Sequence, residues 1–256
     1  MKAGYLQYDV SRDRETNLRL IEATLPSMRC DLVVLPELCL CGYLFSDRKA
    51  LASIAEGVPG GLSTQKMLSL SKRRDCALVF GLAEEDNGKI YNTAVVVDRG
   101  RFIGRYRKIH LTDYEKRFFD RGTQNEVFAL RGYRLGVQIC FDLWFPEISR
   151  EQLRQGADLF CALANFGGET TSGIARTRAI ENLTPLILCN RVGSEKEPGI
   201  DADFRGDSAI IGPDGTVLSQ GKTHVPDHGA ATIEIACEKA NAICSDFQSE
   251  IALHAR

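Results

Sequence analysis

Residues 135–147 of the chain read LGVQICFDLWFPE, an apolar run that ends in a cysteine and continues into Trp-Phe-Pro-Glu. The run is typical of a buried β-strand. Pro146 suits the first turn of an α-helix, and Glu147 lies where the helix dipole favours a negative charge. The stretch therefore predicts a strand ending at Cys140 and a helix running to about Gln155. A free cysteine at such a place is usually a small core residue, so its position alone does not establish chemistry.

Strand and helix patterns alternate on both sides of this stretch. Strands are predicted at residues 2–10, 31–37, 76–84, 89–98, 101–111, 127–131, 133–141, 157–165, 185–193, 207–219 (a hairpin) and 230–236. Helices are predicted after Ser11 or Asp13, over 62–74, from 146 to about 155, over 172–184 and near the end of the chain. Because hairpin turns occur among the helix–strand units, we expect mixed rather than purely parallel sheets in one α/β domain.

The composition is that of an ordinary globular protein. The 256 residues are 44% hydrophobic and 26% charged, and the formal net charge of -2 gives no basic bias toward nucleic acid. The N-terminus becomes charged too early for a secretory signal, and no apolar run reaches the about 18 residues of a membrane span. We therefore expect a cytoplasmic protein with neither a nucleic-acid nor a membrane partner.

The cysteines argue against a disulfide framework and against a metal site. Nine cysteines in a chain of this kind predict reduced thiols, with Cys161 and Cys189 as inert packing in buried strands. Cys39 and Cys41 form a Cys-x-Cys pair, but no second pair accompanies them and the four histidines are scattered. A structural zinc site normally needs four such ligands, so we expect no metal and no cofactor. Zinc binding through Cys39 and Cys41 is a minor alternative.

Three predicted strands end in a residue that can take part in chemistry. They are Glu37 in VVLPELCLCGY, Lys108 in GRYRKIHLTDYEKRFFDRG and Cys140 in GVQICFDLWFPE. Each alone has an ordinary explanation: a solvated carboxylate, a surface lysine and a buried thiol. Their combination is what points to a site.

The order and surroundings of these three residues resemble the nitrilase, or carbon–nitrogen hydrolase, superfamily, over residues 2 to about 235. The likeness includes a second glutamate, Glu115, and the strings RAIENL (178–183), NRVG (190–193) and FRGDSAIIGPDG (204–215). The resemblance implies a four-layer α-β-β-α sandwich with two mixed β-sheets, formed by a single domain of residues 1–256. It also implies a homodimer or higher homo-oligomer, with the tail from about residue 237 packing on a partner subunit.

The resemblance assigns a role to each reactive residue. Cys140 would be the nucleophile, and Glu37 the general base that accepts its proton. Lys108 and the backbone N–H of Phe141 would stabilise the oxyanion, with Glu115 orienting Lys108. A nearby ammonium would also lower the pKa of the thiol. Together they would hydrolyse a non-peptide C–N bond through a thioester and release ammonia or an amine.

The residues after the nucleophile indicate the branch of the superfamily. The chain reads Cys-Phe-Asp, as in amidases and N-carbamoyl hydrolases, where true nitrilases usually have Cys-Trp-Glu. Trp144 occupies a place where many relatives have arginine, which argues against acidic substrates. The predicted substrate-binding residues are Tyr43, Trp144, Asn165 and Phe166. A small amide or N-carbamoyl compound is therefore the expected substrate.

Several alternatives remain open at this stage. The same Glu-Lys-Cys set could hydrolyse nitriles, the chain could be a catalytically silent scaffold, or a thioester could pass its acyl group to an amine. His110, two residues beyond Lys108, offers a Cys–His alternative in which the imidazole is the base. The resemblance gives this histidine a supporting role.

Overall fold

Two six-stranded β-sheets form the centre of the molecule, which the computed structural model describes for residues 1–234 and 243–253. The first sheet has the order β14-β1-β2-β3-β4-β5, with bounds Asp227–Thr232, Lys2–Gln7, Leu32–Val34, Ala77–Asp86, Lys89–Asp98 and Arg101–Arg107. The second has the order β13-β12-β9-β8-β7-β6, with bounds Val217–Gln220, Ala209–Ile211, Leu186–Asn190, Leu159–Ala164, Tyr133–Ile139 and Val127–Leu130.

Both sheets are mixed, as the sequence predicts. In the first sheet β1, β2 and β3 are parallel, whereas β4 and β5 continue it in antiparallel fashion. In the second sheet β7, β8 and β9 are parallel, and β6 and β12 flank them in antiparallel fashion. Cys140 and Asn165 directly follow the carboxyl ends of β7 and β8, and Glu37 lies three residues beyond the end of β2. Parallel pairing therefore carries predicted site residues to strand ends.

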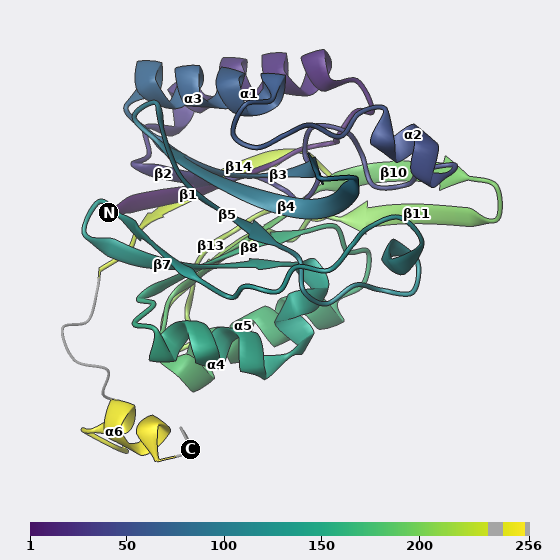
Figure 1. The fold of residues 1–256 in the computed structure, drawn as a ribbon. Helices are drawn as coiled ribbons and strands as arrows, with labels where there is room; N and C mark the ends of the chain where they lie inside the picture. The colour runs from purple at the N-terminus through teal and green to yellow at the C-terminus, as the bar shows by residue number, and fades with distance from the viewer. Residues whose placement is uncertain (235–242, 254–256) are drawn as a thin grey trace.

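Helices cover the outer face of each sheet. Helices α1 (Arg14–Met28) and α3 (Leu62–Arg74) pack on the first sheet, and α4 (Pro146–Arg154) and α5 (Thr170–Asn182) pack on the second (Figure 1). The layer order is thus α-β-β-α, which confirms the predicted four-layer sandwich. Short helices α2 (Arg48–Ala52) and α6 (Phe247–Ala252) lie outside these layers.

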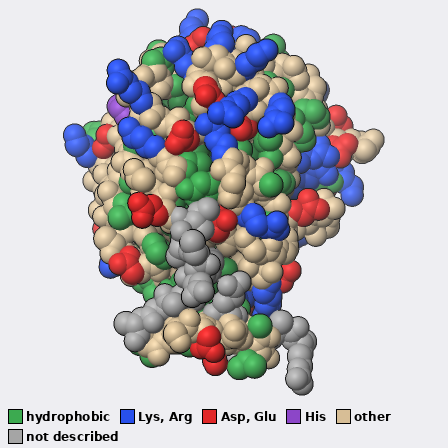
Figure 2. Space-filling view, turned by 90° about the vertical axis from the view of Figure 1, so that its left-hand side faces the viewer, with side chains coloured by type: hydrophobic (Ala, Val, Ile, Leu, Met, Phe, Trp, Pro, Cys, Tyr) green, Lys and Arg blue, Asp and Glu red, His purple; other side chains and the backbone are tan. Residues whose placement is uncertain are grey.

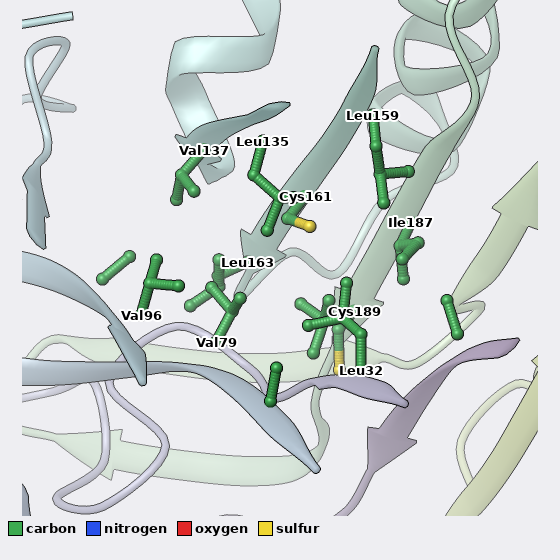
Figure 3. Packing of buried hydrophobic residues seen from close by; sticks show 14 of the residues in the cluster. Leu32, Val79, Val96, Leu135, Val137, Leu159, Cys161, Leu163, Ile187 and Cys189 are labelled. Atoms are coloured by element: carbon green, nitrogen blue, oxygen red, sulfur yellow. The ribbon is translucent and has the colours of Figure 1, made fainter. Parts of the chain in front are cut away.

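The main hydrophobic core lies between the two sheets. Figure 3 shows Leu32, Val79 and Val96 of the first sheet facing apolar side chains of β7, β8 and β9. Cys161 and Cys189 are fully buried in this core, as predicted for packing cysteines. Burial of each large aliphatic side chain contributes about 1.5–3 kcal/mol, so the sheets form a firm base for the loops at their ends.

Several predicted strands are too long, as at 2–10 and 31–37, where the structure has Lys2–Gln7 and Leu32–Val34, and two further differences affect the site. The predicted strand 101–111 ends at Arg107, which leaves Lys108 in the loop that follows β5. The predicted strand 185–193 is two strands, because β9 is followed by β10 (Val192–Glu197), which pairs with β11 (Ile200–Arg205) as a separate two-stranded sheet. The β10–β11 hairpin was missed because charged residues interrupt the apolar alternation on which strand prediction depends.

The outer surface carries charges of both signs. Figure 2 shows lysine and arginine side chains gathered over the α1–α3 layer among scattered acidic ones. Several of these cations are paired, as in the contact of Arg73 with Glu22 at 2.6 Å and that of Arg131 with Asp98 at 2.7 Å. No helix in residues 1–234 or 243–253 is long and apolar enough to cross a membrane.

The C-terminal tail can be described only in part. Residues 237–242 and 254–256 of the predicted tail lie outside the described residues. Within the described part, Ile251 of α6 packs against the hydrophobic cluster of the second helix layer. Packing of the tail on a partner subunit stays a prediction.

Candidate active site

Cys140 lies at a sharp turn between β7 and the 3-10 helix η2 (Cys140–Trp144), which leads into α4. Its φ of 48° is in the left-handed region, which residues with a β-carbon seldom adopt. Such a conformation costs of the order of 1–3 kcal/mol and persists only where the surroundings hold it. The turn leaves Cys140 half-buried, whereas Ile139 before it is fully buried.

The buried carboxylate of Asp142 holds this turn in place. It accepts hydrogen bonds from the Tyr106 hydroxyl at 2.9 Å, the Ile139 backbone N–H at 3.1 Å and the His110 backbone N–H at 2.8 Å. The His110 ring pairs with the same carboxylate at 3.1 Å and stacks on Phe145. His110 therefore supports the turn. The sequence analysis gave Asp142 no role, although its place two residues after the cysteine was a signal.

Lys108 lies between two carboxylates. Its Nζ donates to Glu37 Oε1 at 2.7 Å and to Glu115 Oε1 at 2.5 Å. The Asn92 amide of β4 donates to the same two oxygens, at 2.6 and 3.3 Å. Glu115 begins the 3-10 helix η1 (Glu115–Arg117), and its Oε2 accepts the Thr112 backbone N–H at 2.9 Å. Segments far apart in the sequence thus meet at one ammonium group.

The chain reaches Glu37 by a tight turn after β2. Leu38, the next residue, has a φ of 46°, and the backbone of β3 passes close beside it at Gly81. A β-carbon at Gly81 would collide with the Leu38 backbone nitrogen. Gly81 therefore permits the approach that turns the Glu37 side chain toward Lys108.

Burial divides the four reactive residues into two groups. Glu37, Lys108 and Glu115 are fully buried, whereas Cys140 is half-buried. Glu37 Oε2 is also buried, and it has no hydrogen-bond partner among the described residues. An unpaired buried carboxylate oxygen is costly, so a structure usually retains one only where another group is to be received.

The buried charges shift the pKa values of one another. Burial raises the pKa of Glu37 to about 7, although Lys108 acts in the opposite direction. Burial also opposes ionisation of Lys108 and Glu115, but their mutual attraction outweighs it. The pKa of Lys108 is therefore raised and that of Glu115 lowered, so at neutral pH these two form an ion pair. Glu37 alone lies near its titration point.

The Cys140 thiol does not have the lowered pKa that the sequence analysis expected. Burial raises its pKa well above the ordinary value, and the Glu37 charge raises it further. Lys108 acts to lower it, but one ammonium does not offset the loss of solvent and the nearby carboxylates. The resting sulfur is therefore a thiol, and its proton must be removed as it reacts.

The predicted substrate-binding residues differ in their surroundings. Burial and then the charge of Glu115 raise the pKa of Tyr43, whereas the charge of Lys108 acts to lower it, so the phenol interacts with the reactive residues. The Asn165 side-chain amide is buried, with no partner for either polar atom in the described part of the chain. The backbone of Asn165 hydrogen-bonds to the Cys140 sulfur, which acts to lower the pKa of the thiol.

The aromatic candidates near η2 have two different environments. Trp144 is 45% exposed, with its ring 6.0 Å from that of Phe141. Phe166 is buried in the cluster between the second sheet and its helices, against which Cys140 also packs. A contact of either residue with substrate stays a prediction, as does the oxyanion role of the Phe141 backbone N–H.

The Cys39–Cys41 pair has no features of a metal site. Burial raises the pKa of both thiols to about 12, which disfavours the thiolates that zinc requires. Among the described residues, no group of three or more His, Cys, Asp or Glu side chains is placed to hold a metal ion.

Comparison with known proteins gives one consistent result. The family model for carbon-nitrogen hydrolases matches residues 2–236. A protein named nitrilase from Pyrococcus abyssi is 38% identical over 80% of this chain and 77% of its own length. An (R)-stereoselective amidase from Pseudomonas sp is 31% identical over 85% of this chain and 77% of its own. The crystal structure of a carbon-nitrogen hydrolase from Helicobacter pylori G27 is 27% identical, covers 90% of this chain and 88% of its own, and superposes with a TM-score of 0.84.

The match over nearly the whole chain agrees with the layer order and with the contact of Glu37 and Lys108, whose charges act on Cys140. The chain belongs to the nitrilase superfamily of carbon–nitrogen hydrolases, and it is a hydrolase of C–N bonds other than peptide bonds.

Proposed function

We propose that the protein hydrolyses a small primary amide or N-carbamoyl compound through a thioester on Cys140. The observation that carries the proposal is the position of Lys108 Nζ, 2.7 Å from Glu37 and 2.5 Å from Glu115, in a buried set that interacts electrostatically with the half-buried Cys140. We further propose that it acts in the cytoplasm as a homodimer or a higher homo-oligomer.

The first half of the reaction forms the thioester. Glu37 takes the Cys140 proton, for which its unpaired Oε2 is free, while the sulfur attacks the carbonyl carbon. Lys108 and the Phe141 backbone N–H stabilise the negative oxygen of the tetrahedral intermediate. Glu37 then gives its proton to the leaving nitrogen, the C–N bond breaks, and ammonia or an amine departs.

The second half regenerates the enzyme. Glu37 removes a proton from water, the hydroxide attacks the thioester carbon, and the C–S bond breaks with return of that proton to sulfur. One water is consumed and one carboxylic acid (or a carbamic acid, which loses carbon dioxide) is released. Glu115 keeps Lys108 charged and oriented throughout, through the 2.5 Å contact.

We expect kcat/KM to rise with pH through the titration of Glu37. Only the carboxylate form can accept the thiol proton, and burial raises the pKa of this group to about 7. Activity should therefore fall by about tenfold per pH unit well below that value, since the base is then protonated. The measurement is kcat/KM for a neutral amide from pH 5 to 8.5. A profile flat down to pH 5 would contradict a base of raised pKa.

The substrate class is tested by ammonia release across primary amides, N-carbamoyl compounds and nitriles of matched side chain. We expect an amide or N-carbamoyl compound to have the highest kcat/KM, because Cys140-Phe141-Asp142 follows the amidase pattern. The Cys140→Ala variant measures the background rate of ammonia release. Nitrile hydrolysis is the second candidate, favoured by the name of the Pyrococcus abyssi relative. A nitrile with a higher kcat/KM than every amide and N-carbamoyl compound in the panel would establish nitrile hydrolysis instead.

A further inference from the structure

The loop that carries Tyr43 wraps around a single carboxylate. Glu195 of β10 accepts the backbone N–H of Tyr43, at 3.0 Å on Oε1 and 3.1 Å on Oε2, and that of Leu44 at 2.9 Å on Oε2. Gly42 has a φ of 80°, and a β-carbon there would lie only 3.1 Å from Glu195 Oε1. Successive backbone amides around an anion form a nest, whose shape depends on the charge it encloses.

A buried arginine fixes this carboxylate in turn. The Arg191 side chain is 1% exposed and forms a short ion pair with Glu195. Its guanidinium also donates to the Val10 carbonyl at 2.8 Å and lies 4.3 Å from the centre of the Phe204 ring. Arg191 therefore ties Glu195 to β11 and to the chain after β1, and the carboxylate cannot move independently of either.

The Tyr43 side chain connects this network of contacts to the reactive residues. The Tyr43 ring contacts Tyr114 with centroids 5.6 Å apart and meets Phe204 edge-on at 6.0 Å. The charges of Glu115, Lys108, Glu37 and Cys140 all act on its phenol. Tyr43 thus forms an aromatic wall against the cluster that contains Leu38, the neighbour of Glu37, and its backbone is held from the β10–β11 hairpin.

We propose that Glu195 is a positioning residue that sets this wall, so that the β10–β11 hairpin controls which acyl groups reach Cys140. The inference rests on the proposed function and extends it. Tyr43, Tyr114 and Phe204 present aromatic surface, so the class of substrate is an amide whose acyl group is small and uncharged. Neutralising Glu195 removes the anion from the nest, and an amide NH2 in its place would oppose the N–H groups that now point at it.

The test compares Glu195→Gln with wild type on acetamide and phenylacetamide. We expect KM for acetamide to rise about tenfold, the usual scale for one lost apolar contact, with kcat changed far less. The acetamide-to-phenylacetamide ratio of kcat/KM should fall by at least about fivefold. This ratio does not depend on the fraction of folded enzyme, so a purely structural loss would leave it unchanged.

Matched variants separate positioning from general damage. Asp201→Asn removes a carboxylate of the same hairpin, whose ion pair with Lys196 at 3.0 Å joins two well-exposed side chains, and it should keep the wild-type ratio. Glu195→Asp keeps the charge but retracts it, and should shift the ratio less than glutamine does. In a Tyr43→Ala background Glu195→Gln should change the ratio no further, because both act through one side chain. Additive effects, or an equal shift in Asp201→Asn, would overturn the proposal.

Alkylation of Cys140 distinguishes failure of the inference from failure of the proposed function. The rates of Cys140 labelling by iodoacetamide and by its N-benzyl derivative, measured by peptide mass, report access without hydrolysis. We expect Glu195→Gln to change their ratio in the same direction as the amide ratio. If wild type hydrolyses neither amides nor nitriles yet this shift appears, the proposed function fails and the positioning role stands. An unchanged labelling ratio refutes the positioning role whatever the hydrolytic result.

Discussion

Replacement of Cys140 by alanine is expected to abolish hydrolysis, with kcat falling by about 10⁶-fold, the scale seen when a hydrolase loses its nucleophile. In the proposed mechanism no thioester can form without the sulfur, and the water activated by Glu37 would have to attack an amide instead. Alanine keeps the β-carbon, so the turn at a φ of 48° is not strained further. The fold and the thermal midpoint should therefore stay close to wild type.

The measurement is ammonia release by purified Cys140→Ala, together with mass spectrometry of the wild-type protein during turnover. Wild type should show an adduct of the mass of the acyl group on the peptide that holds Cys140, and the variant none. Cys161→Ala is the matched control, because it removes a fully buried thiol from the adjacent strand β8. We expect it to lose about 1 kcal/mol of stability and little activity. Activity of Cys140→Ala above about a hundredth of wild type would point to another nucleophile.

The sequence predicts the β-sheets well wherever a strand is buried on both faces. The run at 31–37 and the strand before Cys140 are apolar because each strand is covered by the opposite sheet on one face and by a helix layer on the other. The β10–β11 hairpin has no such layer on either side, so its residues need not be apolar and the strand signal is weak. The number of layers came from the family resemblance, since periodicity alone does not determine how sheets stack.

The residues of the site could be predicted from the sequence, but the pKa values of their side chains could not. Glu37, Lys108 and Cys140 stand at recognisable strand ends, and the structure brings Lys108 and both glutamates into direct contact. The pKa of the thiol depends on a balance between burial and three nearby charges, which no local pattern records. Asp142 was missed for a related reason, because its donors come from Tyr106, His110 and Ile139 and only the fold assembles them.

The second large effect is expected for Lys108→Met, which removes the positive charge between the buried carboxylates of Glu37 and Glu115. Loss of the ammonium removes the side-chain donor that we propose for the oxyanion, which should lower kcat by about 10²–10³-fold. It also leaves Glu37 and Glu115, which shared one Nζ, as two buried carboxylates without a cation. Breaking a buried ion pair in this way typically costs about 3–5 kcal/mol of stability.

The stability loss in Lys108→Met should depend on pH, with a sign fixed by the carboxylates. In wild type Lys108 lowers the pKa of Glu115, so the stability from that group is present above its ordinary pKa and is lost as pH falls. Glu37, whose pKa is raised to about 7, contributes stability at low pH that is lost as pH rises to that value. In the variant the lowering effect of Lys108 is lost, so burial and mutual repulsion raise the pKa of both carboxylates above their wild-type values, and the folded variant retains more protons than folded wild type. A raised pKa contributes stability at low pH that is lost as pH rises, by up to about 1.4 kcal/mol per pH unit for one proton.

Urea unfolding of wild type and Lys108→Met from pH 5 to pH 8 measures this directly. The difference in unfolding free energy between the two proteins should grow as pH rises. Lys116→Met is the control, since its ion pair with Asp113 at 2.6 Å joins side chains 49% and 97% exposed and is worth little. A Lys108→Met penalty that is constant across this range would mean that loss of the ammonium does not raise the pKa of either carboxylate. The set would then be held by hydrogen bonds to Asn92 and Thr112 rather than by charge.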